Sequence, residues 1–463
     1  MPKKKEKTPL KKHQRESIDK IKRHNGVLLY HGLGSGKTLT ALRASEEIKK
    51  PLSVIGPASL RGNFKKEKVK HKVKTPLDYS SYTKPQPKSQ GILAFDEAHR
   101  MGRIESKRSR YPDEFKADKK VFLTGTPIRN EPSELIPLLR GIGMDVPRNK
   151  KKFYDKYVQE EKVWPSIGGI LKGVEPGVKL TPKNMNELTL KAMDKVDYHK
   201  SSSKNFPRVI EEDVNVPMSD YQWSVYSKAL DEKPTLQYKI KKGIPPSKKE
   251  APGMNSFLNA TRQISNTTKA YTGKSTPTPK LQRMVKDITE AHKANPNYKG
   301  VTYSNYLESG VHPMAALLKK NKIKSGVFTG ETNDEERKKI IKNYNKGKIK
   351  HLLISGAGSE GLDLKGTRLV QTMEPHWNNA RLKQVHGRAV RMGSHDHLPP
   401  SQRKVSIKNY FSTAREGKKG FTTDQYIKRL ADDKDALNKG FLKALQNADI
   451  DDNNLDALTK SPS

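Results

Sequence analysis

Two hydrophobic patterns alternate along the first 145 residues of the chain. Short runs at residues 27–30, 92–95 and 121–123 are apolar without interruption. Such runs are typical of strands that are buried on both faces of a parallel sheet. Between the first two runs, residues 39–49 carry apolar side chains at helical spacing. The pattern therefore predicts an α/β domain built on a parallel sheet.

The same alternation returns after residue 280 and predicts a second parallel sheet. The predicted strands cover residues 300–304, 327–330 and 352–355, and the predicted helices cover residues 281–292 and 334–345. Towards the end of the chain, two more helices are predicted at residues 424–430 and 436–446. The acidic, Asn-rich tail that follows is expected to be disordered.

Between residues 144 and 276 the signals are weaker, with frequent Pro, Gly and Lys and short apolar stretches. Residues 206–214 are predicted to form a strand. Residues 219–230 are predicted to form a helix that begins at Ser219 or Asp220. We expect this region to be a partly helical insertion between the two α/β domains.

The composition adds a strong positive charge to this picture. The chain has 91 Lys and Arg against 50 Asp and Glu, a formal net charge of +41. Such an excess favours a polyanionic partner, most simply nucleic acid, although a lysine-rich proteome with solvated surfaces would give the same charge. The absence of Cys excludes disulfides, cysteine-ligated zinc and thiol catalysis. No apolar run approaches the roughly 20 residues that span a bilayer, so no membrane partner is expected.

A glycine-rich segment, His-Gly-Leu-Gly-Ser-Gly-Lys-Thr, follows the first predicted strand and opens the first predicted helix. This context is the one that a nucleotide phosphate loop requires. Gly34, Ser35 and Gly36 would turn backbone N–H groups onto phosphate oxygens. Lys37 would reach the β- and γ-phosphates of ATP, and the Thr38 hydroxyl would bind Mg²⁺.

Two further segments with chemistry follow predicted strands of the first sheet. Asp96 and Glu97 end the run at residues 92–95, at the edge where parallel sheets place their reactive groups. Asp96 would hold Mg²⁺ through water, and Glu97 would orient and deprotonate the attacking water. Thr124 and Thr126 follow the next strand and could link the state of the nucleotide to the grip on nucleic acid.

The order Gly-Ser-Gly-Lys-Thr, Asp-Glu-Ala-His and Leu-Thr-Gly-Thr-Pro resembles the superfamily-two helicases. The sequence Pro-Ala-Ser-Leu around Ser59 is similar to a segment of the Swi/Snf-type branch that lies along the nucleic-acid backbone. Gln14, in Leu-Lys-Lys-His-Gln, resembles the upstream glutamine that contacts adenine in that branch. His31 stands where many phosphate loops have glycine, a position that varies among helicase-like families.

The resemblance extends to the second half of the chain. A Gly/Ser-rich loop after residue 355, which contains Gly361 and Asp363, resembles the fifth motif of the family and implies contacts with the ATP site. The sequence Gln-Val-His-Gly-Arg-Ala-Val-Arg begins at Gln384, which the resemblance places in coupling to nucleic acid. Its arginines match the family's arginine fingers, Arg391 in the first place and Arg388 in the second. If this segment is helical throughout, the two arginines share one face.

The wider run from residue 374 to 395 is especially similar to the transcription-associated ATPases and helicases of large nucleocytoplasmic DNA viruses. The resemblance implies two RecA-like P-loop NTPase lobes with parallel sheets, joined by a partly helical insertion and followed by C-terminal helices. The predicted domains cover residues 1–145, 146–276, 277–415 and 416–463.

The implied function is an ATP- and Mg²⁺-dependent translocase that moves along nucleic acid, with duplex DNA favoured over other substrates. Viral transcription or replication machinery is a possible partner class, inside the host cytoplasm, the nucleus or the virion. A monomer suffices, because both lobes lie in one chain. Two rival hypotheses stay open. One is a strand-separating DNA or RNA helicase, and the other is a basic structural protein that binds nucleic acid and has a vestigial ATP site.

Overall fold

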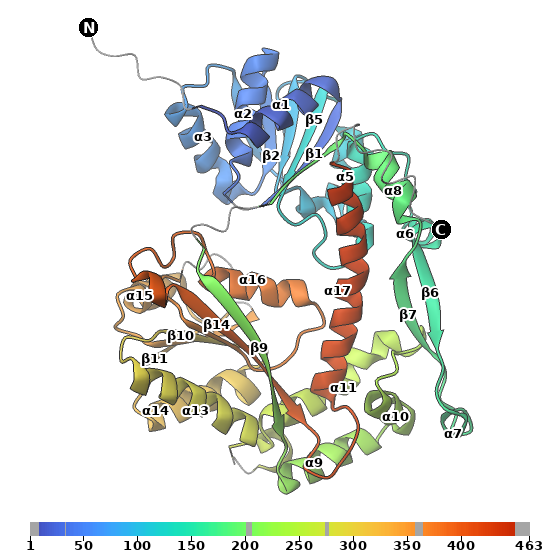
Figure 1. Cartoon of the computed structure of the whole chain (residues 1–463), viewed down its shortest axis with the longest axis vertical. Coiled ribbons are helices and arrows are strands. Elements are labelled where there is room, and N and C mark those ends of the chain that lie inside the picture. Colours follow the sequence, from blue (N-terminus) through green and yellow to red (C-terminus); the bar gives the residue numbers. More distant parts are fainter. Residues whose placement is uncertain (1–8, 33, 201–205, 274–276, 357–363, 450–463) are drawn as a thin grey trace. The chain divides into compact units, whose positions relative to one another are not determined.

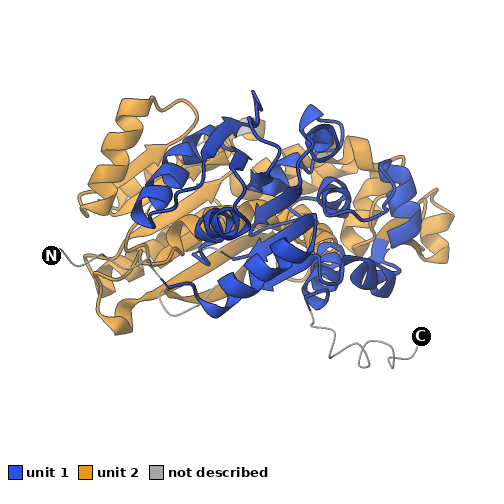
Figure 2. Ribbon diagram, turned by 90° about the horizontal axis from the view of Figure 1, so that it is seen from above, with its two compact units in different colours: residues 1–159, 180–202, 436–463 blue, residues 160–179, 203–435 orange. Residues whose placement is uncertain are grey.

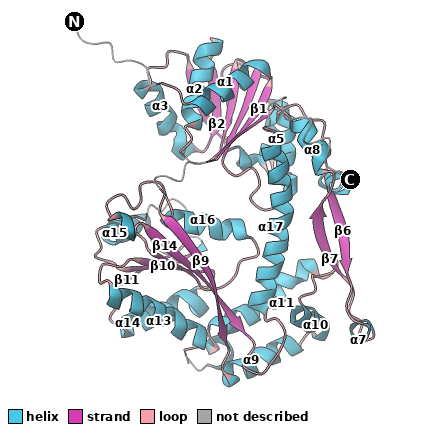
Figure 3. Cartoon of the chain, in the orientation of Figure 1, coloured by secondary structure: helices cyan, strands magenta, loops and turns pink. Residues whose placement is uncertain are grey.

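The computed structural model describes residues 9–449, except for 33, 201–205, 274–276 and 357–363. It contains two compact units, coloured separately in Figure 2. Unit 1 comprises Met1–Gln159, Leu180–Ser202 and Ala436–Ser463, and unit 2 comprises Glu160–Lys179 and Ser203–Asp435. Each unit is built around one parallel six-stranded sheet, shown in magenta in Figure 3.

The sheet of unit 1 has the strand order β3-β2-β4-β5-β1-β8. Its strands are β1 (Gly26–His31), β2 (Leu52–Gly56), β3 (Leu77–Ser81), β4 (Ile92–Asp96), β5 (Lys119–Thr124) and β8 (Val196–His199). Strands β2 and β4 are buried along their whole length, and the apolar run at residues 92–95 of β4 predicts this burial. The three strands predicted for this sheet are confirmed.

Helices cover both faces of this sheet (Figure 1). One core is closed by α1 (Lys12–Arg23), α2 (Lys37–Ile48) and α3 (Arg61–Lys70). The other includes α5 (Ile136–Gly141), α6 (Lys150–Tyr157), α8 (Met185–Ala192) and the second half of α17 (Thr423–Asn447). From that half of α17, Leu437, Phe441 and Leu445 are buried in this core.

The sheet of unit 2 has the order β11-β12-β10-β13-β14-β9, and all its neighbours are parallel. Its strands are β9 (Arg208–Pro217), β10 (Gly300–Ser304), β11 (Ser325–Phe328), β12 (His351–Ser355), β13 (Leu369–Thr372) and β14 (Lys404–Thr413). One core contains α13 (Pro279–Ala294) and α14 (His312–Lys320), and the other contains α15 (Asp334–Asn345) and α16 (Asn379–Ala389). The strands predicted at residues 300–304, 327–330 and 352–355 and the helices predicted at residues 281–292 and 334–345 are therefore confirmed as elements.

A helical group of unit 2 packs around the first half of α17, where Tyr426 and Ile427 are buried. It is formed by α9 (Asp220–Asp231), α10 (Pro234–Lys242) and α11 (Ala251–Asn266), with the short α12 (Lys269–Thr272) following. A two-stranded sheet of β6 (Val158–Val163) and β7 (Gly177–Pro182) carries α7 (Ile167–Ile170) between its strands. The remaining short helices are α4 (Tyr111–Glu114), η1 (Ala58–Leu60), η2 (Ala98–Met101), η3 (Lys107–Arg110), η4 (Pro132–Leu135), η5 (Leu307–Val311) and η7 (Pro400–Gln402).

The structure differs from the prediction in the middle of the predicted insertion. Strand β8 extends the first sheet beside β1, and β9 extends the second sheet beside β14. The sequence Val-Asp-Tyr-His of β8 is too short and too polar to be recognised as a strand. The division at residues 145, 276 and 415 stays a prediction, but one edge strand of each six-stranded sheet comes from within the segment predicted to be an insertion.

The two helices predicted near the end of the chain are one continuous helix, α17, and the predicted break was wrong. The residues between them are polar, which looked like an interruption of the apolar pattern. They contain no Pro or Gly, and Lys428 pairs with Asp432 at a helix-supporting spacing of four residues. The predicted tail lies outside the described residues. No described helix is both long enough and apolar enough to span a membrane.

Candidate nucleotide and nucleic-acid site

The glycine-rich loop of unit 1 joins β1 to α2, at the carboxyl end of the sheet. Gly34 and Gly36 have φ angles of 75° and 87°, which glycine adopts without strain. Lys37 is the first residue of α2, and its ammonium group donates to the carbonyl oxygens of His31 at 2.7 Å and Gly32 at 3.2 Å. Ser35 is buried and Thr38 is half-buried within the same turn. The loop thus has the strand–loop–helix geometry of a phosphate-binding site.

The region around Lys37 is desolvated and acidic. Burial lowers the pKa of Lys37, whereas the negative charges of Glu97 and Asp96 act in the opposite direction. Gly125, which follows β5, lies beside the loop, because a Cβ added to it would be 3.2 Å from the His31 carbonyl oxygen and 4.0 Å from the Lys37 nitrogen. The structure therefore brings the predicted segments after β1, β4 and β5 together at one edge of the sheet.

Gln14 lies directly against the glycine loop. It is buried in α1, and its side-chain nitrogen is 3.5 Å from the carbonyl oxygens of both Ser35 and Gly36. A Cβ added to Gly36 would come within 2.4 Å of that nitrogen, so any larger residue there would displace the Gln14 side chain, in addition to the strain set by its backbone angle. The Gln14 side-chain oxygen accepts from the backbone N–H of Lys11. A movement of the glycine loop would therefore change the contacts of Gln14.

The two acidic residues stand at the end of β4. Burial and the adjacent charge of Glu97 raise the pKa of Asp96 to about 7, with Lys37 opposing the shift. Glu97 has a φ angle of 51°, in the left-handed region that non-glycine residues seldom adopt. Strain of this kind is typically retained at functional sites. The backbone angle turns Glu97 away from the direction of the strand and starts η2.

His99 connects the acidic segment to the threonines after β5. Its Nδ1 atom lies 3.0 Å from the Thr124 hydroxyl, 3.4 Å from the Thr126 hydroxyl and 3.4 Å from a carboxylate oxygen of Glu97. Burial and nearby cationic side chains lower the pKa of His99 to about 3, so the ring is neutral at physiological pH. Thr124 is buried and Thr126 is exposed. His99 was not predicted to be a site residue, although its place in the sequence Asp-Glu-Ala-His was the available signal.

The donor set fits Mg²⁺ bound together with a nucleotide. The hydroxyl of Thr38 and the carboxylate of Asp96 are oxygen ligands, which Mg²⁺ prefers. The raised pKa of Asp96 shows that its charge is poorly compensated by the protein alone, and a cation would compensate it. No described cluster of three or more His, Cys, Asp or Glu side chains could hold a metal by itself.

Replacing Asp96 with Asn is expected to stabilise the nucleotide-free protein more at pH 8 than at pH 5. The pKa of Asp96 is about 7 in the folded chain, against an ordinary value of 3.8, so the folded state binds more protons between these values. Stability contributed by the protonated carboxyl is therefore lost as the pH rises towards and through 7. Asn loses nothing over this range, and the difference in unfolding free energy should grow by about 2–4 kcal/mol. Urea unfolding of both proteins at the two pH values measures it, and an equal difference at both would contradict the prediction.

Ser59 lies in η1, which follows β2 at the same edge of the sheet, and it is exposed. The next helix, α3, begins at Arg61 and carries Lys65, Lys66, Lys68 and Lys70. An exposed hydroxyl followed by a row of cations is suited to contact a phosphate backbone.

In unit 2, Gln384 is exposed on α16, and Arg388 is half-buried near the end of the same helix. The helix ends at Ala389, and Val390 has φ and ψ angles of −100° and 75°. Arg391 therefore lies beyond the helix, and the expectation that both arginines share a helical face was wrong. Its carbonyl oxygen instead accepts from the hydroxyl of Ser394 at 2.7 Å. Gly361 and Asp363 lie outside the described residues.

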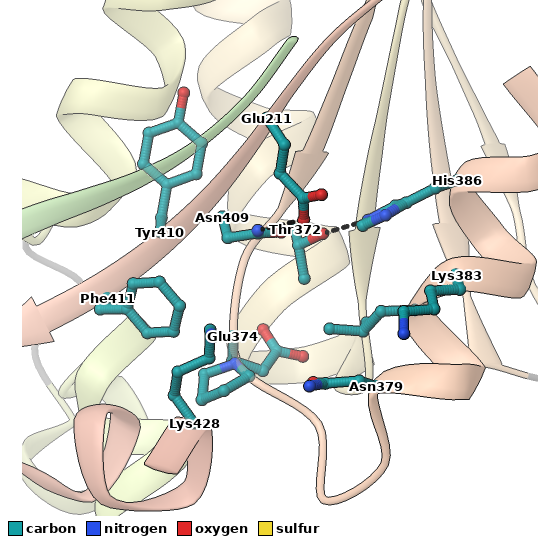
Figure 4. Close-up of a pocket in the computed structure, with 12 residues that line it drawn as sticks. Glu211, Thr372, Glu374, Asn379, Lys383, His386, Asn409, Tyr410, Phe411 and Lys428 are labelled. Carbon is teal, nitrogen blue, oxygen red and sulfur yellow. Dashed lines mark hydrogen bonds between the residues drawn. The ribbon is translucent and has the colours of Figure 1, made fainter. Parts of the chain in front are cut away.

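A pocket borders α16 on the side of β13, β14 and the first half of α17 (Figure 4). His386 is buried there, with its Nε2 atom 3.1 Å from the Thr372 hydroxyl. Burial lowers the pKa of His386 to about 4. On the neighbouring edge, Asn409 donates to Glu211 at 3.0 Å. The buried contact between His386 and Thr372 fixes α16 on the sheet and thereby fixes the helix that carries Gln384 and Arg388.

Parallel sheets with a glycine loop, an adjacent acidic pair and hydrogen-bonded threonines at one edge define a P-loop nucleoside triphosphatase of the helicase type. The chain matches the SNF2-related domain over residues 77–270 and the helicase conserved C-terminal domain over residues 280–393. It belongs to the SNF2-type family of superfamily-two helicases and ATPases. Gln384, Arg388 and Arg391 fall within the second match.

Two viral proteins are similar in sequence to this chain. It is 31% identical over 466 residues to a candidate ATP-dependent RNA helicase of Acanthamoeba polyphaga mimivirus, covering 96% of this chain and 98% of the relative. It is 26% identical over 559 residues to the termination factor NPH-I homologue of African swine fever virus, covering 92% and 76%. The Hef helicase domain of Pyrococcus furiosus aligns with a TM-score of 0.52 at 16% identity, over 90% of this chain and 97% of that one. This last similarity concerns the fold alone.

Proposed function

We propose that the protein is an ATP-driven translocase that moves along duplex DNA. The contacts of His99 carry this proposal, because they connect Glu97 with Thr124 and Thr126. If a change at the γ-phosphate moves Glu97, the neutral imidazole of His99 would transmit that movement to both threonines. Membership of the SNF2-type family favours duplex DNA as the track.

In the proposed mechanism the glycine loop binds the phosphates of ATP, and Lys37 exchanges its contacts with loop carbonyls for contacts with phosphate oxygens. Thr38 and Asp96 would hold Mg²⁺, which neutralises phosphate charge when bound. Glu97 accepts a proton from the attacking water. Arg388 and Arg391 of unit 2 complete the charge stabilisation of the transferred phosphoryl group.

The nucleic-acid contacts are proposed to be mainly electrostatic. The net charge of +41 and the cationic helix after Ser59 favour contacts with phosphate rather than with base edges. Such binding has little sequence preference and weakens steeply as salt is raised. Gln384, exposed on α16, is the corresponding candidate contact of unit 2.

Steady-state ATP hydrolysis tests the proposal in four conditions: no nucleic acid, single-stranded DNA, duplex DNA and RNA. We expect the largest stimulation with duplex DNA, by about tenfold or more. Duplex DNA should also support displacement of a third strand from a triplex, without separation of the two strands of the duplex. Stimulation mainly by duplex DNA with triplex displacement supports translocation, whereas stimulation mainly by single strands contradicts it.

A strand-separating helicase is the second candidate, since the mimivirus relative is named as an RNA helicase. Unwinding of a tailed RNA or DNA duplex would favour it. The name of the African swine fever virus relative suggests work with transcription machinery, and we propose a transcribing complex as the setting in which this chain acts. Co-purification with a viral RNA polymerase would support that setting, and exclusive association with replication proteins would contradict it.

A further inference from the structure

The edge strand β8 contacts the phosphate loop although nothing in its sequence resembles a nucleotide-binding motif. It runs parallel to β1, with Leu29 opposite Asp197 and His31 opposite His199. The carbonyl oxygen of His199 accepts from the backbone N–H of Gly32 at 2.9 Å, within the glycine-rich segment. The strand therefore supports the loop from the side, by backbone contact and by two side chains.

Asp197 is the acidic side chain of β8 that contacts the start of the loop. Its carboxylate is buried, lies 2.8 Å from Nε2 of His31 and accepts from the hydroxyl of Ser17. The Lys20 ammonium group is 4.0 Å away. Burial alone would raise the pKa of Asp197, but hydrogen bonds from His31 and Ser17 hold it below its ordinary value. The carboxylate therefore joins the start of the phosphate loop to α1, one turn after Gln14.

The orientation of His31 depends on this carboxylate. His31 is completely buried, and its Nδ1 atom has no hydrogen-bond partner among the described residues. Asp197 supplies the only side-chain hydrogen bond of the ring within that part of the chain. Without it, a buried imidazole would lose its remaining polar partner, and the backbone of the loop entrance would lose a fixed point.

The second side-chain contact runs through a pair of histidines. The rings of His199 and His13 are stacked, with their centroids 3.7 Å apart and an interplanar angle of 8°. His13 also lies with its Nε2 atom 2.9 Å from the carbonyl oxygen of Ser35, at the centre of the loop. Strand β8 thus contacts the entrance of the loop directly and reaches its middle only through His13 of α1.

We propose that Asp197 is a positioning residue for ATP binding, which acts on the phosphates through His31 and the entrance of the glycine loop. The inference rests on the proposed function only in taking ATP as the ligand of that loop. It assigns β8 a role in nucleotide affinity rather than in nucleic-acid binding. A displacement of about 1 Å in the groups that position a substrate can reduce the reaction rate by about 100-fold.

Asp194 provides a matched control. It precedes β8 and also ties this segment to α1, through Arg23 at 2.9 Å and His24 at 2.6 Å. These contacts lie near the far end of α1 from Gln14 and do not involve the glycine loop. Both carboxylates therefore attach the same segment to the same helix, but only Asp197 adjoins the loop. Loss of attachment affects both variants, and loss of loop positioning affects only one.

The experiment compares Asp197→Ala, Asp197→Asn and Asp194→Ala with the unaltered full-length chain. Calorimetric titration with Mg-ADP gives the nucleotide dissociation constant without nucleic acid or turnover. Steady-state kinetics give KM for ATP separately from kcat, and DNA binding without nucleotide reports the integrity of the rest of the chain. We expect Asp197→Ala to weaken Mg-ADP binding and raise KM about tenfold, with DNA binding within twofold. Asp194→Ala should change each quantity by less than twofold.

Asp197→Asn decides the matter if the alanine variant does not fold. Asn keeps the size of the side chain but removes its charge. His31 and Ser17 both bond to the Oδ2 atom of Asp197, so Asn leaves them at most a neutral acceptor, whose hydrogen bonds are weaker than those of a carboxylate. At least a threefold weaker Mg-ADP affinity with normal DNA binding would support the proposal. Unchanged nucleotide affinity in a folded Asp197 variant would overturn it, as would equal losses in the Asp194 control. An absence of duplex stimulation in the unaltered chain would count against translocation only, because the Mg-ADP titration needs no nucleic acid.

Discussion

Replacing Glu97 with Gln is expected to reduce ATP turnover about 1,000-fold while nucleic-acid binding at low salt stays within twofold. Gln has nearly the same size but cannot accept the proton of the attacking water, and positioned general bases contribute about 10²–10⁴-fold to a rate. The amide should keep a hydrogen bond within reach of His99, so the local geometry changes little. Single-turnover hydrolysis at saturating ATP measures the effect on the chemical step.

Glu105→Gln is a suitable control, because Glu105 is an exposed glutamate in the segment that follows η2. It should keep at least half of the turnover. A Glu97→Gln protein that hydrolyses ATP at more than a tenth of the normal rate would exclude Glu97 as the base. Joint loss of turnover and nucleic-acid binding would indicate that Glu97 acts by maintaining the fold.

Replacing Arg391 with Ala is expected to lower kcat about 1,000-fold with at most a threefold change in nucleotide affinity. An arginine finger neutralises charge that develops in the transition state, and its loss typically costs about 10³–10⁵-fold in rate. Arg391 lies beyond the end of α16, so the substitution does not interrupt that helix. Stopped-flow measurement of nucleotide binding, together with kcat, separates the two quantities.

The same measurements on Arg388→Ala rank the two arginines, and we expect the smaller loss there. Arg415 offers a control in unit 2, since it is a cation whose ion pair with Asp220 at 2.8 Å lies away from α16. Its replacement should leave kcat within twofold. Equal losses of kcat and nucleotide affinity in Arg391→Ala would remove the finger role from that residue.

The central strands could be predicted from the sequence because they are buried on both faces and therefore uninterrupted in their apolar pattern. The edge strand β8 lacks that property, because it contains an aspartate and a histidine, and it was not predicted. The edge strand β9 was predicted at residues 206–214 although its first six positions are all exposed, but its place in the second sheet was not predicted. Their places in the sheets are set by pairing with β14 and β1, which involves residues far away in the chain.

The candidate site shows the same limit. Lys37, Asp96 and Glu97 could be proposed from the sequence because the residues of each motif are neighbours in the chain, and the structure places the two motifs at one edge of the sheet. The hydrogen bond between Asp197 and His31 joins residues 166 positions apart, so no local pattern contains it. The contact of His99 with Thr124 could have been suspected only from the order of the motifs. The end of α16 before Arg391 depends on the local backbone angles at Val390 rather than on composition.

Helix α17 has a consequence for how the chain is made. Leu437, Phe441 and Leu445 complete a core of unit 1 whose members before α17 all come from the first 200 residues. During synthesis those residues leave the ribosome long before the helix does. The apolar surface that α17 covers must then stay exposed while more than 200 further residues are added. The first part of the chain to be translated is therefore among the last to be finished, and its need for a chaperone should be greatest in that interval.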